Sequence, residues 1–220
     1  MKTLCSLVGI GGLLYGVGAA DLGAAERYTS LGGVSARLDV SYGVLPPDLD
    51  GDFDFDQVIT VEAVWQSRLG MTSYRNFGVV WGVGVAGHYQ NMDTTNVDAE
   101  YMGGSARYHL GLTYGLSHSW HLQAVPYAGV GWGNMDLDLI YRIPGDNFVR
   151  ADSPSDDSGF GEFGLQFHAI YSNPDSFEFG AGLSFQGRIA DYDFTDSIVP
   201  FLVHNEQYYI SLNVTGGWRF

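Results

Sequence analysis

Apolar and polar residues alternate along most of the chain. In the first such segment Val34 and Ala36 lie on one side of the alternation, and Ser35 and Arg37 lie on the other. Successive side chains of a β-strand point to opposite faces, so this period predicts strands with one apolar and one polar face. The predicted strands cover residues 34–43, 59–66, 77–90, 105–114, 120–132, 162–171, 177–188 and 207–220.

Eight strands of this kind predict a transmembrane β-barrel. Strands of such barrels alternate between lipid-facing and lumen-facing side chains, and bacterial single-chain barrels have an even number of strands. A secreted β-sandwich is the alternative, but its polar faces would carry Lys and Glu, whereas these carry mainly Gly, Ser and single Arg residues. Glycine accounts for 31 of 220 residues, and charged residues for 16%, below the usual ~25%. We expect an all-β protein whose residues 31–220 form an eight-stranded antiparallel up-and-down transmembrane β-barrel with long acidic extracellular loops.

The predicted connections alternate in length. Outer membrane barrels have long extracellular loops and short periplasmic turns, so we expect both termini on the periplasmic side. The long connections are 44–57, 90–101, 134–159 and 189–206, and the shorter ones are 67–76, 117–119 and 172–176.

The first 20 residues have the composition of a secretory signal peptide. Lys2 supplies a positive charge, residues 4–17 are apolar but too few to span a bilayer, and residues 18–20 are small. A buried N-terminal helix is the alternative, and the glycines of this segment disfavour it. We expect removal of residues 1–20, which takes the only cysteine with it, and a short periplasmic segment at residues 21–30 ahead of the barrel.

The polar faces of the predicted strands carry both basic and acidic residues. The interior of eight strands is just wide enough for side chains, and a charge left unpaired there would cost about 3–5 kcal/mol. The sequence therefore predicts a closed lumen with a paired charge network, with a gated ion path as the alternative. The inward His88, His109, His121 and His168 are expected to be hydrogen-bonded core residues, with a metal cluster as the alternative. The predicted network consists of Arg37, Asp39, Glu62, Arg107, Glu162, Glu178, Arg188 and Arg219.

Most of the acidic residues fall in the predicted loops. The formal net charge of −15 argues against nucleic acid as a partner, since its phosphates recruit Lys and Arg. In the first long loop, aspartates alternate around Gly51, and such carboxylates suit Ca²⁺ or Mg²⁺, although no glutamate closes the loop as in an EF-hand. We expect no other cofactor. These aspartates are Asp48, Asp50, Asp52, Asp54 and Asp56.

Within the third predicted long loop the apolar residues change from even-numbered to odd-numbered positions. Even-numbered residues face lipid in the strand at 120–132, yet Asp136 is acidic while its neighbour Met135 is apolar. This change predicts a strand that leaves the membrane and continues in water as a ribbon, and residues 189–194 show the same change. Protruding ribbons have open edges on which another chain can form a strand. The sequence therefore favours a structural or surface-binding, adhesion-like role toward an extracellular ligand or surface partner.

These features resemble the small eight-stranded outer membrane barrels of the OmpA transmembrane-domain and OmpX-like superfamily. Residues 122–131 are similar to a strand segment common in that group. Trp218 and Phe220 resemble its C-terminal assembly signal, although Thr215 stands where the group usually has glycine. The resemblance covers residues 31–220 and implies a barrel embedded in outer membrane lipid and folded by the barrel assembly machinery. It indicates architecture more reliably than function.

Some small outer membrane barrels are enzymes that modify lipid. A lipid A deacylase of this kind is expected to carry a His-x-Ser-Asn segment, and Ser117-His118-Ser119 is the nearest approach here. It lacks the asparagine and falls in a predicted periplasmic turn, on the wrong side for the outer leaflet. We therefore expect no enzyme, and the alternatives are a small gated solute or ion channel and a lipid-modifying enzyme.

Overall fold

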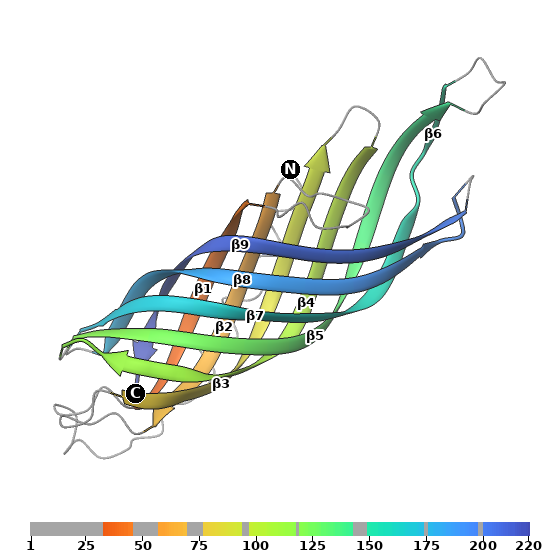
Figure 1. The fold of residues 1–220 in the computed structure, drawn as a ribbon. Coiled ribbons are helices and arrows are strands. Elements are labelled where there is room, and N and C mark those ends of the chain that lie inside the picture. Colours follow the sequence, from red (N-terminus) through yellow and green to blue (C-terminus); the bar gives the residue numbers. More distant parts are fainter. Residues whose placement is uncertain are drawn as a thin grey trace.

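The computed structural model describes residues 33–45, 57–69, 77–93, 97–117, 119–142, 149–173, 176–197 and 200–220. These residues are almost entirely β-strand (Figure 1). Within the described ranges there is no helix of a length and hydropathy that would cross a bilayer. The strands are β1 (Gly33–Leu45), β2 (Gln57–Leu69), β3 (Phe77–Asp93), β4 (Val97–Gly115), β5 (Trp120–Arg142), β6 (Val149–Asp152), β7 (Ser155–Ser172), β8 (Phe177–Phe194) and β9 (Phe201–Arg219).

Eight of these strands close into a ring. Their order is β4-β3-β2-β1-β9-β8-β7-β5, and β5 pairs with β4 to complete the ring. All the pairings are antiparallel. The short strand β6 lies outside the ring and pairs only with the far end of β5. The predicted all-β, eight-stranded up-and-down barrel is confirmed.

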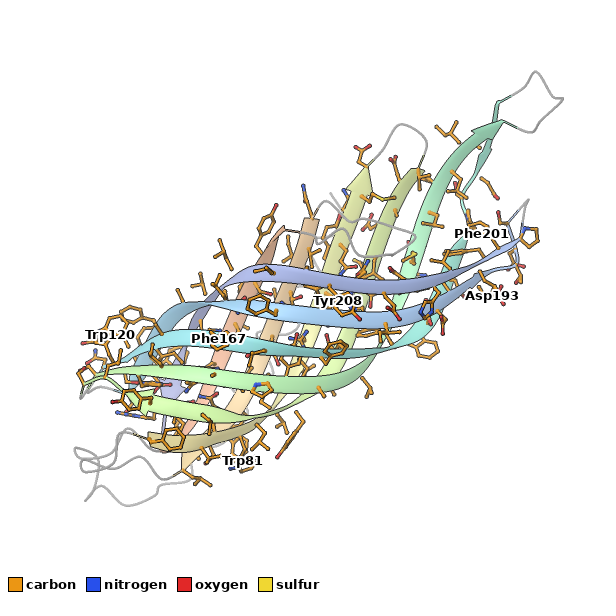
Figure 2. The ribbon with its side chains drawn as sticks, in the orientation of Figure 1. Trp81, Trp120, Phe167, Asp193, Phe201 and Tyr208 are labelled. Atoms are coloured by element: carbon orange, nitrogen blue, oxygen red, sulfur yellow. The ribbon has the colours of Figure 1, made fainter. Side chains whose placement is uncertain are left out.

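The two faces of the ring differ in polarity. Side chains that point into the barrel are polar along most of its length, whereas those that point outward are apolar. Val85, Val130 and Val214 are 67%, 71% and 66% exposed on the outer surface, where Phe167 and Tyr208 also lie (Figure 2). An apolar outer belt around a polar interior is the arrangement of transmembrane β-barrels, because the outer face meets lipid.

The two ends of the barrel are built differently. At one end, here called the turn end, short connections join β4 to β5 and β7 to β8. At the other, here called the ribbon end, β5 with β6 and the hairpin of β8 and β9 extend well beyond their neighbours (Figure 1). The two protruding ribbons therefore lie at the same end of the molecule.

The strands run further at the ribbon end than the alternation predicted. β4 begins at Val97 rather than at residue 105, and it stays paired with β3 up to Asp93↔Asp98. The predicted loop at 90–101 was therefore too long, because the ladder continues there with the apolar side chains of Met92, Ala99 and Tyr101 turned inward. β5 and β8 continue as ribbons, as the change of alternation predicted.

Pro126 interrupts the ladder between β4 and β5. The pairs His109↔Tyr127 and Leu112↔Ala124 are formed, but the positions between them are unpaired. Proline has no backbone N–H to donate to a ladder.

The wall splits between β7 and β8 at the ribbon end. Their pairing stops at Phe160↔Ala190, although both strands continue. A continued ladder would set Asp157 against Asp193, and like charges directly opposite each other are destabilising. Instead, the backbone N–H of Asp193 donates to the Asp156 carboxylate over 2.7 Å. Near its tip the β8–β9 hairpin is thus joined to β7 by a hydrogen bond from its backbone to a side chain of β7. Asp193 and Phe201 mark this tip in Figure 2.

Candidate functional site

A network of charged side chains closes the middle of the lumen. Arg107 donates through Nε and Nη2 to the two carboxylate oxygens of Glu162, each over 2.7 Å, and through Nη1 to Glu62 Oε2 over 2.9 Å. His109 Nε2 lies 2.7 Å from Glu62 Oε1, and His88 Nε2 lies 3.5 Å from Glu162 Oε2. None of the five residues is more than 5% exposed. Because paired Arg–carboxylate bonds are strong and directional, this central network ties opposite walls of the barrel together.

Glycines in the barrel wall make room for these long side chains. Gly129 lies between Arg107 and Glu162 in one row of the sheet. A Cβ at Gly129 would lie 3.0 Å from Glu162 Oε1 and 3.1 Å from Arg107 Cγ. A Cβ at Gly84 would lie 3.1 Å from Glu62 Cδ. Inward glycines thus stand where charged side chains cross the lumen, which accounts for part of the high glycine content.

A second buried ion pair closes the lumen at the turn end. Arg68 Nη2 donates to Glu178 Oε1 over 2.5 Å, and its Nη1 donates to His121 Nε2 over 2.7 Å. The Ser172 hydroxyl also donates to Glu178 Oε1, over 2.8 Å. Arg68 and Glu178 are 2% and 0% exposed. The barrel is therefore filled by polar side chains at this end as well.

The structure places most of the predicted lumen charges in the barrel interior. Arg37 Nη2 lies 3.5 Å from Asp39 Oδ2, and its Nη1 donates to Gln123 Oε1 over 3.0 Å. Arg219, in contrast, is only half-buried at the turn end. The predicted residues that are no more than 5% exposed are Arg37, Asp39, Glu62, Arg107, Glu162, Glu178 and Arg188.

The pairing differs from the expected pairing at two places. Arg68, which the sequence placed in a connection, supplies the partner of Glu178. Arg68 lies on the same face of the strand as the inward Glu62 and Gln66, so the alternation extended by two more residues would have found it. Among the residues that the structure describes, Arg188 has no hydrogen-bond partner at any of its three guanidinium nitrogens, because Arg107 already binds both oxygens of Glu162.

Towards the ribbon end the interior becomes apolar, whereas the alternation predicted a lumen filled by charged and polar side chains. Tyr101 and Phe160 pack edge-to-face, with ring centroids 6.2 Å apart, and Tyr101 packs in the same way on Tyr192. We call this group the apolar plug. Because its side chains fill the lumen between the central network and the ribbon end, the apolar plug forms a third layer that closes the lumen. Its buried members are Val58, Met92, Ala99, Tyr101, Met135, Leu137, Phe160, Ala190, Tyr192, Phe194, Val203 and Tyr209.

Outside the apolar plug, the same strands present rows of carboxylates. Asp93, Asp98 and Asp138 lie opposite one another in one row across β3, β4 and β5, and Glu100 lies opposite Asp136 in a neighbouring row. All five are exposed. We call these five residues the acidic face. Like charges directly opposite one another destabilise a sheet, so this surface carries a cost in stability.

A histidine lies among carboxylates on the β8–β9 hairpin. His204 Nδ1 is 2.5 Å from Asp191 Oδ1, and its Nε2 is 3.2 Å from Glu206 Oε1. All three side chains are exposed to water. The hydrogen bonds to Asp191 and then to Glu206 raise the pKa of His204 above its ordinary value of 6.5.

We expect a nuclear magnetic resonance titration of the protein in lipid nanodiscs to show the His204 imidazole titrating above pH 6.5. Because its folded-state pKa is raised, the stabilisation it gives is complete below about pH 6.5. That stabilisation disappears as the pH rises through the folded-state pKa. In Asp191→Asn the pKa of His204 should fall back towards 6.5; an unchanged titration would show that Asp191 is not the cause.

The other histidines that the structure describes have separate polar neighbours. His88 lies between the hydroxyls of Thr60 and Ser105, at 3.1 Å and 3.0 Å. His121 lies beside Arg68, and His168 lies beside Asn213. Within the described ranges no group of three His, Cys, Asp or Glu side chains is arranged to hold a metal ion.

Several predicted features lie outside the described residues. These are the signal peptide and periplasmic segment within residues 1–32, and the five aspartates expected to suit Ca²⁺ or Mg²⁺, which are Asp48, Asp50, Asp52, Asp54 and Asp56. All of them stay predictions.

The C-terminal residues Trp218 and Phe220 lie at the turn end, and so do Ser117 and Ser119 of the turn between β4 and β5. The Trp218 ring packs edge-to-face on Phe177 with centroids 5.7 Å apart, and the backbone N–H of Phe220 donates to the Val34 carbonyl over 2.8 Å. Their role as an assembly signal stays a prediction. The Ser117 hydroxyl accepts hydrogen bonds from the backbone of Ser119 and Trp120, at 3.3 Å and 3.1 Å, so it has a structural function in the turn.

No protein-family model and no curated protein matches the sequence. Solved structures similar to it include Ail, the attachment invasion locus protein of Yersinia pestis, at 14% identity and a TM-score of 0.43, covering 86% of this chain and 99% of that one. Neisserial surface protein A is similar at 10% identity and a TM-score of 0.39, covering 87% and 99%. A major outer membrane protein from Thermus thermophilus is similar at 15% identity and a TM-score of 0.39, covering 85% and 99%.

These likenesses are distant, so the assignment of the fold rests on the ladders of this chain. Its eight-stranded ring, outward apolar belt and filled polar interior are those of a small outer membrane β-barrel.

Proposed function

We propose that the protein is a non-enzymatic outer membrane barrel that binds a cationic partner at the cell surface through its acidic face. The ribbon end faces the outside of the cell, and both termini lie on the periplasmic side. Support for this orientation comes from the asymmetry of the barrel, because long elements belong outside and short turns inside.

The observation that carries the proposal is the acidic face itself. Asp98 lies directly opposite Asp138, and Glu100 lies directly opposite Asp136. Opposed like charges of this kind are destabilising, and a partner that supplies positive charge removes that cost on binding. Among the side chains that the structure describes, the acidic face contains no Lys or Arg, which favours a second molecule as the source of positive charge.

The proposal is tested by binding of an oligo-arginine peptide to the protein in lipid nanodiscs. In the double variant Asp98→Asn/Asp138→Asn we expect affinity to fall about fivefold, from the loss of two exposed charge interactions. The same variant should unfold at a higher temperature than the wild type, because an opposed like-charge pair is gone. Binding is measured by biolayer interferometry, and unfolding by the change in mobility of the barrel on a gel after heating.

A matched control separates the acidic face from net charge. Asp157→Asn/Asp196→Asn removes two carboxylates from β7 and from the turn after β8, and so changes the net charge equally. It should leave the affinity close to that of the wild type. An equal loss in both double variants would show that the peptide responds only to overall charge, and the proposal would fail.

A further inference from the structure

Two described strands of the barrel wall, β7 and β8, face each other at the ribbon end without pairing. Their ladder stops at Phe160↔Ala190, although β7 reaches back to Ser155 and β8 runs on to Phe194. On their other sides, residues 155–159 pair with β5 and residues 191–194 pair with β9. We call the two facing edges, residues 155–159 and 191–194, the seam. Each edge continues a strand whose ladder is in register up to the point where it stops.

Carboxylates meet at the seam. If the ladder continued in the same register, Asp157 would lie directly opposite Asp193, and Asp191 would be the diagonal neighbour of Asp157. All three residues are exposed. Like charges directly opposite each other are destabilising. Repulsion between the ionised carboxylates therefore opposes the extra pairs and keeps the seam open.

Side-chain contacts take the place of ladder bonds across the open seam. The backbone N–H of Asp193 is directed at β7, where it donates to Asp156 Oδ2 over 2.7 Å. The Ser197 hydroxyl, in the turn after β8, donates to the Asp152 carboxylate of β6. The open seam is thus held by specific hydrogen bonds, so the split has a defined structure of its own.

The inner side of the β8–β9 hairpin keeps the two edges near each other. Tyr192 and Phe194 are both 1% exposed in the apolar plug, and their rings stack with centroids 6.3 Å apart. Tyr192 also packs edge-to-face on Tyr101, at 6.5 Å. The hairpin is therefore anchored whether or not its edge is paired. Closing the seam requires the loss of repulsion, and no further strand has to be supplied.

The charged side chains around this pair of aspartates are mainly acidic. His204 is the exception on the outer side, and it lies between Asp191 and Glu206. Arg188 points inward and stacks on the rings of Tyr101 and Phe160. Among the side chains that the structure describes, no Lys or Arg faces the outer side of the seam, so protonation is the direct way to remove the repulsion. The other acidic residues nearby are Asp136 of β5, Asp152 of β6, Asp156 of β7 and Asp196 of the turn after β8.

We propose that the seam is an acid-sensitive switch, which is open while Asp157 and Asp193 are ionised and closes when they are neutralised. Closure extends the β7–β8 ladder by pairing residues 155–159 with residues 191–195. It joins the β8–β9 hairpin and the ribbon of β5 and β6 into one sheet. The acidic face lies on β3, β4 and β5, so this switch goes beyond the proposed binding function and does not depend on it.

The test places spin labels at Ser155→Cys and Thr195→Cys, two exposed positions that would face each other across a closed seam. The protein carries Cys5→Ser and is refolded in lipid vesicles. Paired strands lie about 5 Å apart, so closure should produce dipolar broadening of the electron paramagnetic resonance spectrum. We expect no broadening at pH 7 and clear broadening at about pH 3, where carboxyl groups are mostly protonated. In Asp157→Asn/Asp193→Asn the broadening should be present at both pH values.

Hydrogen exchange without labels gives a second measurement at pH 7, where amides 191–194 should exchange more slowly in Asp157→Asn/Asp193→Asn than in the wild type. The matched control is Asp93→Asn/Asp98→Asn, which removes an opposed pair of carboxylates from β3 and β4 and should behave like the wild type. Equal closure in this control would show a response to net charge alone and would overturn the inference.

Two other outcomes would also contradict the switch. One is a wild-type spectrum that does not broaden in acid. The other is an Asp157→Asn/Asp193→Asn variant that stays open at pH 7 and closes in acid, because the response would then belong to His204, which gains its proton over the same range. Binding of oligo-arginine to the acidic face is measured separately, so the proposed function can survive either failure.

Discussion

Replacing Arg107 with methionine should destabilise the barrel by about 3–5 kcal/mol, because it leaves buried carboxylates without a counter-charge. Arg107 makes three hydrogen bonds to Glu62 and Glu162, and all three residues are no more than 4% exposed. Methionine keeps most of the packing volume, so the loss reports mainly the charge. Urea unfolding in lipid vesicles, followed by gel mobility, measures the change in the free energy of unfolding.

A triple variant isolates the electrostatic cause of this loss. In Arg107→Met/Glu62→Gln/Glu162→Gln no carboxylate of the central network is left unpaired, so most of the lost stability should return. Removing all the charges of a buried group is often far less damaging than removing one of them. A triple variant as unstable as Arg107→Met would mean that packing rather than charge explains the loss. An Arg107→Met variant as stable as the wild type would contradict the role of the network altogether.

In planar bilayers the refolded protein should show no steady single-channel openings, with or without Ca²⁺. Three layers of side chains close the lumen in series: the Arg68–Glu178 pair, the central network and the apolar plug. An ion on this route would have to cross both paired charges and a layer of mainly apolar side chains. Steady openings in the wild type would support the channel alternative and contradict the closed lumen.

The presence of three closing layers also predicts the conductance of a variant that lacks one of them. A variant whose central network is replaced by small residues, Arg107→Ser/Glu62→Ser/Glu162→Ser, should also be silent, since the other two layers remain. Met135 and Leu137 of the apolar plug are 0% and 1% exposed, so the plug is closely packed at these positions. Openings in this variant alone would show that the central network is the only barrier and that the apolar plug does not seal the barrel.

The architecture could be predicted from the sequence because it depends on a short-range period. Each strand repeats the same alternation, and the barrel follows from the number of strands and from the polarity of their two faces. The ribbons at β5 and β8 could also be predicted, since the exchange of apolar and acidic positions around Met135 is visible in the sequence alone.

The partners inside the lumen could not be predicted in the same way. Arg107 and Glu162 are 55 positions apart in the sequence, and which side chains meet depends on the stagger of the strands around the ring. Arg188 shows the limit clearly: equal numbers of predicted charges suggested complete pairing, yet Arg107 takes two carboxylates and leaves Arg188 with none. The apolar plug was missed because the inward side of the ribbons was assigned to loops.

The exchange of polarity along β5 also sets how deeply the molecule sits in its bilayer. Val130 and Trp132 are exposed apolar residues of the outer surface, and Asp136 and Asp138 follow within a few positions. Sinking further would carry these carboxylates into hydrocarbon, while rising would bring the tryptophan into water, so both displacements are opposed. β5 therefore fixes the depth at which the barrel lies in the bilayer, and a bilayer of different thickness would have to adapt to the protein.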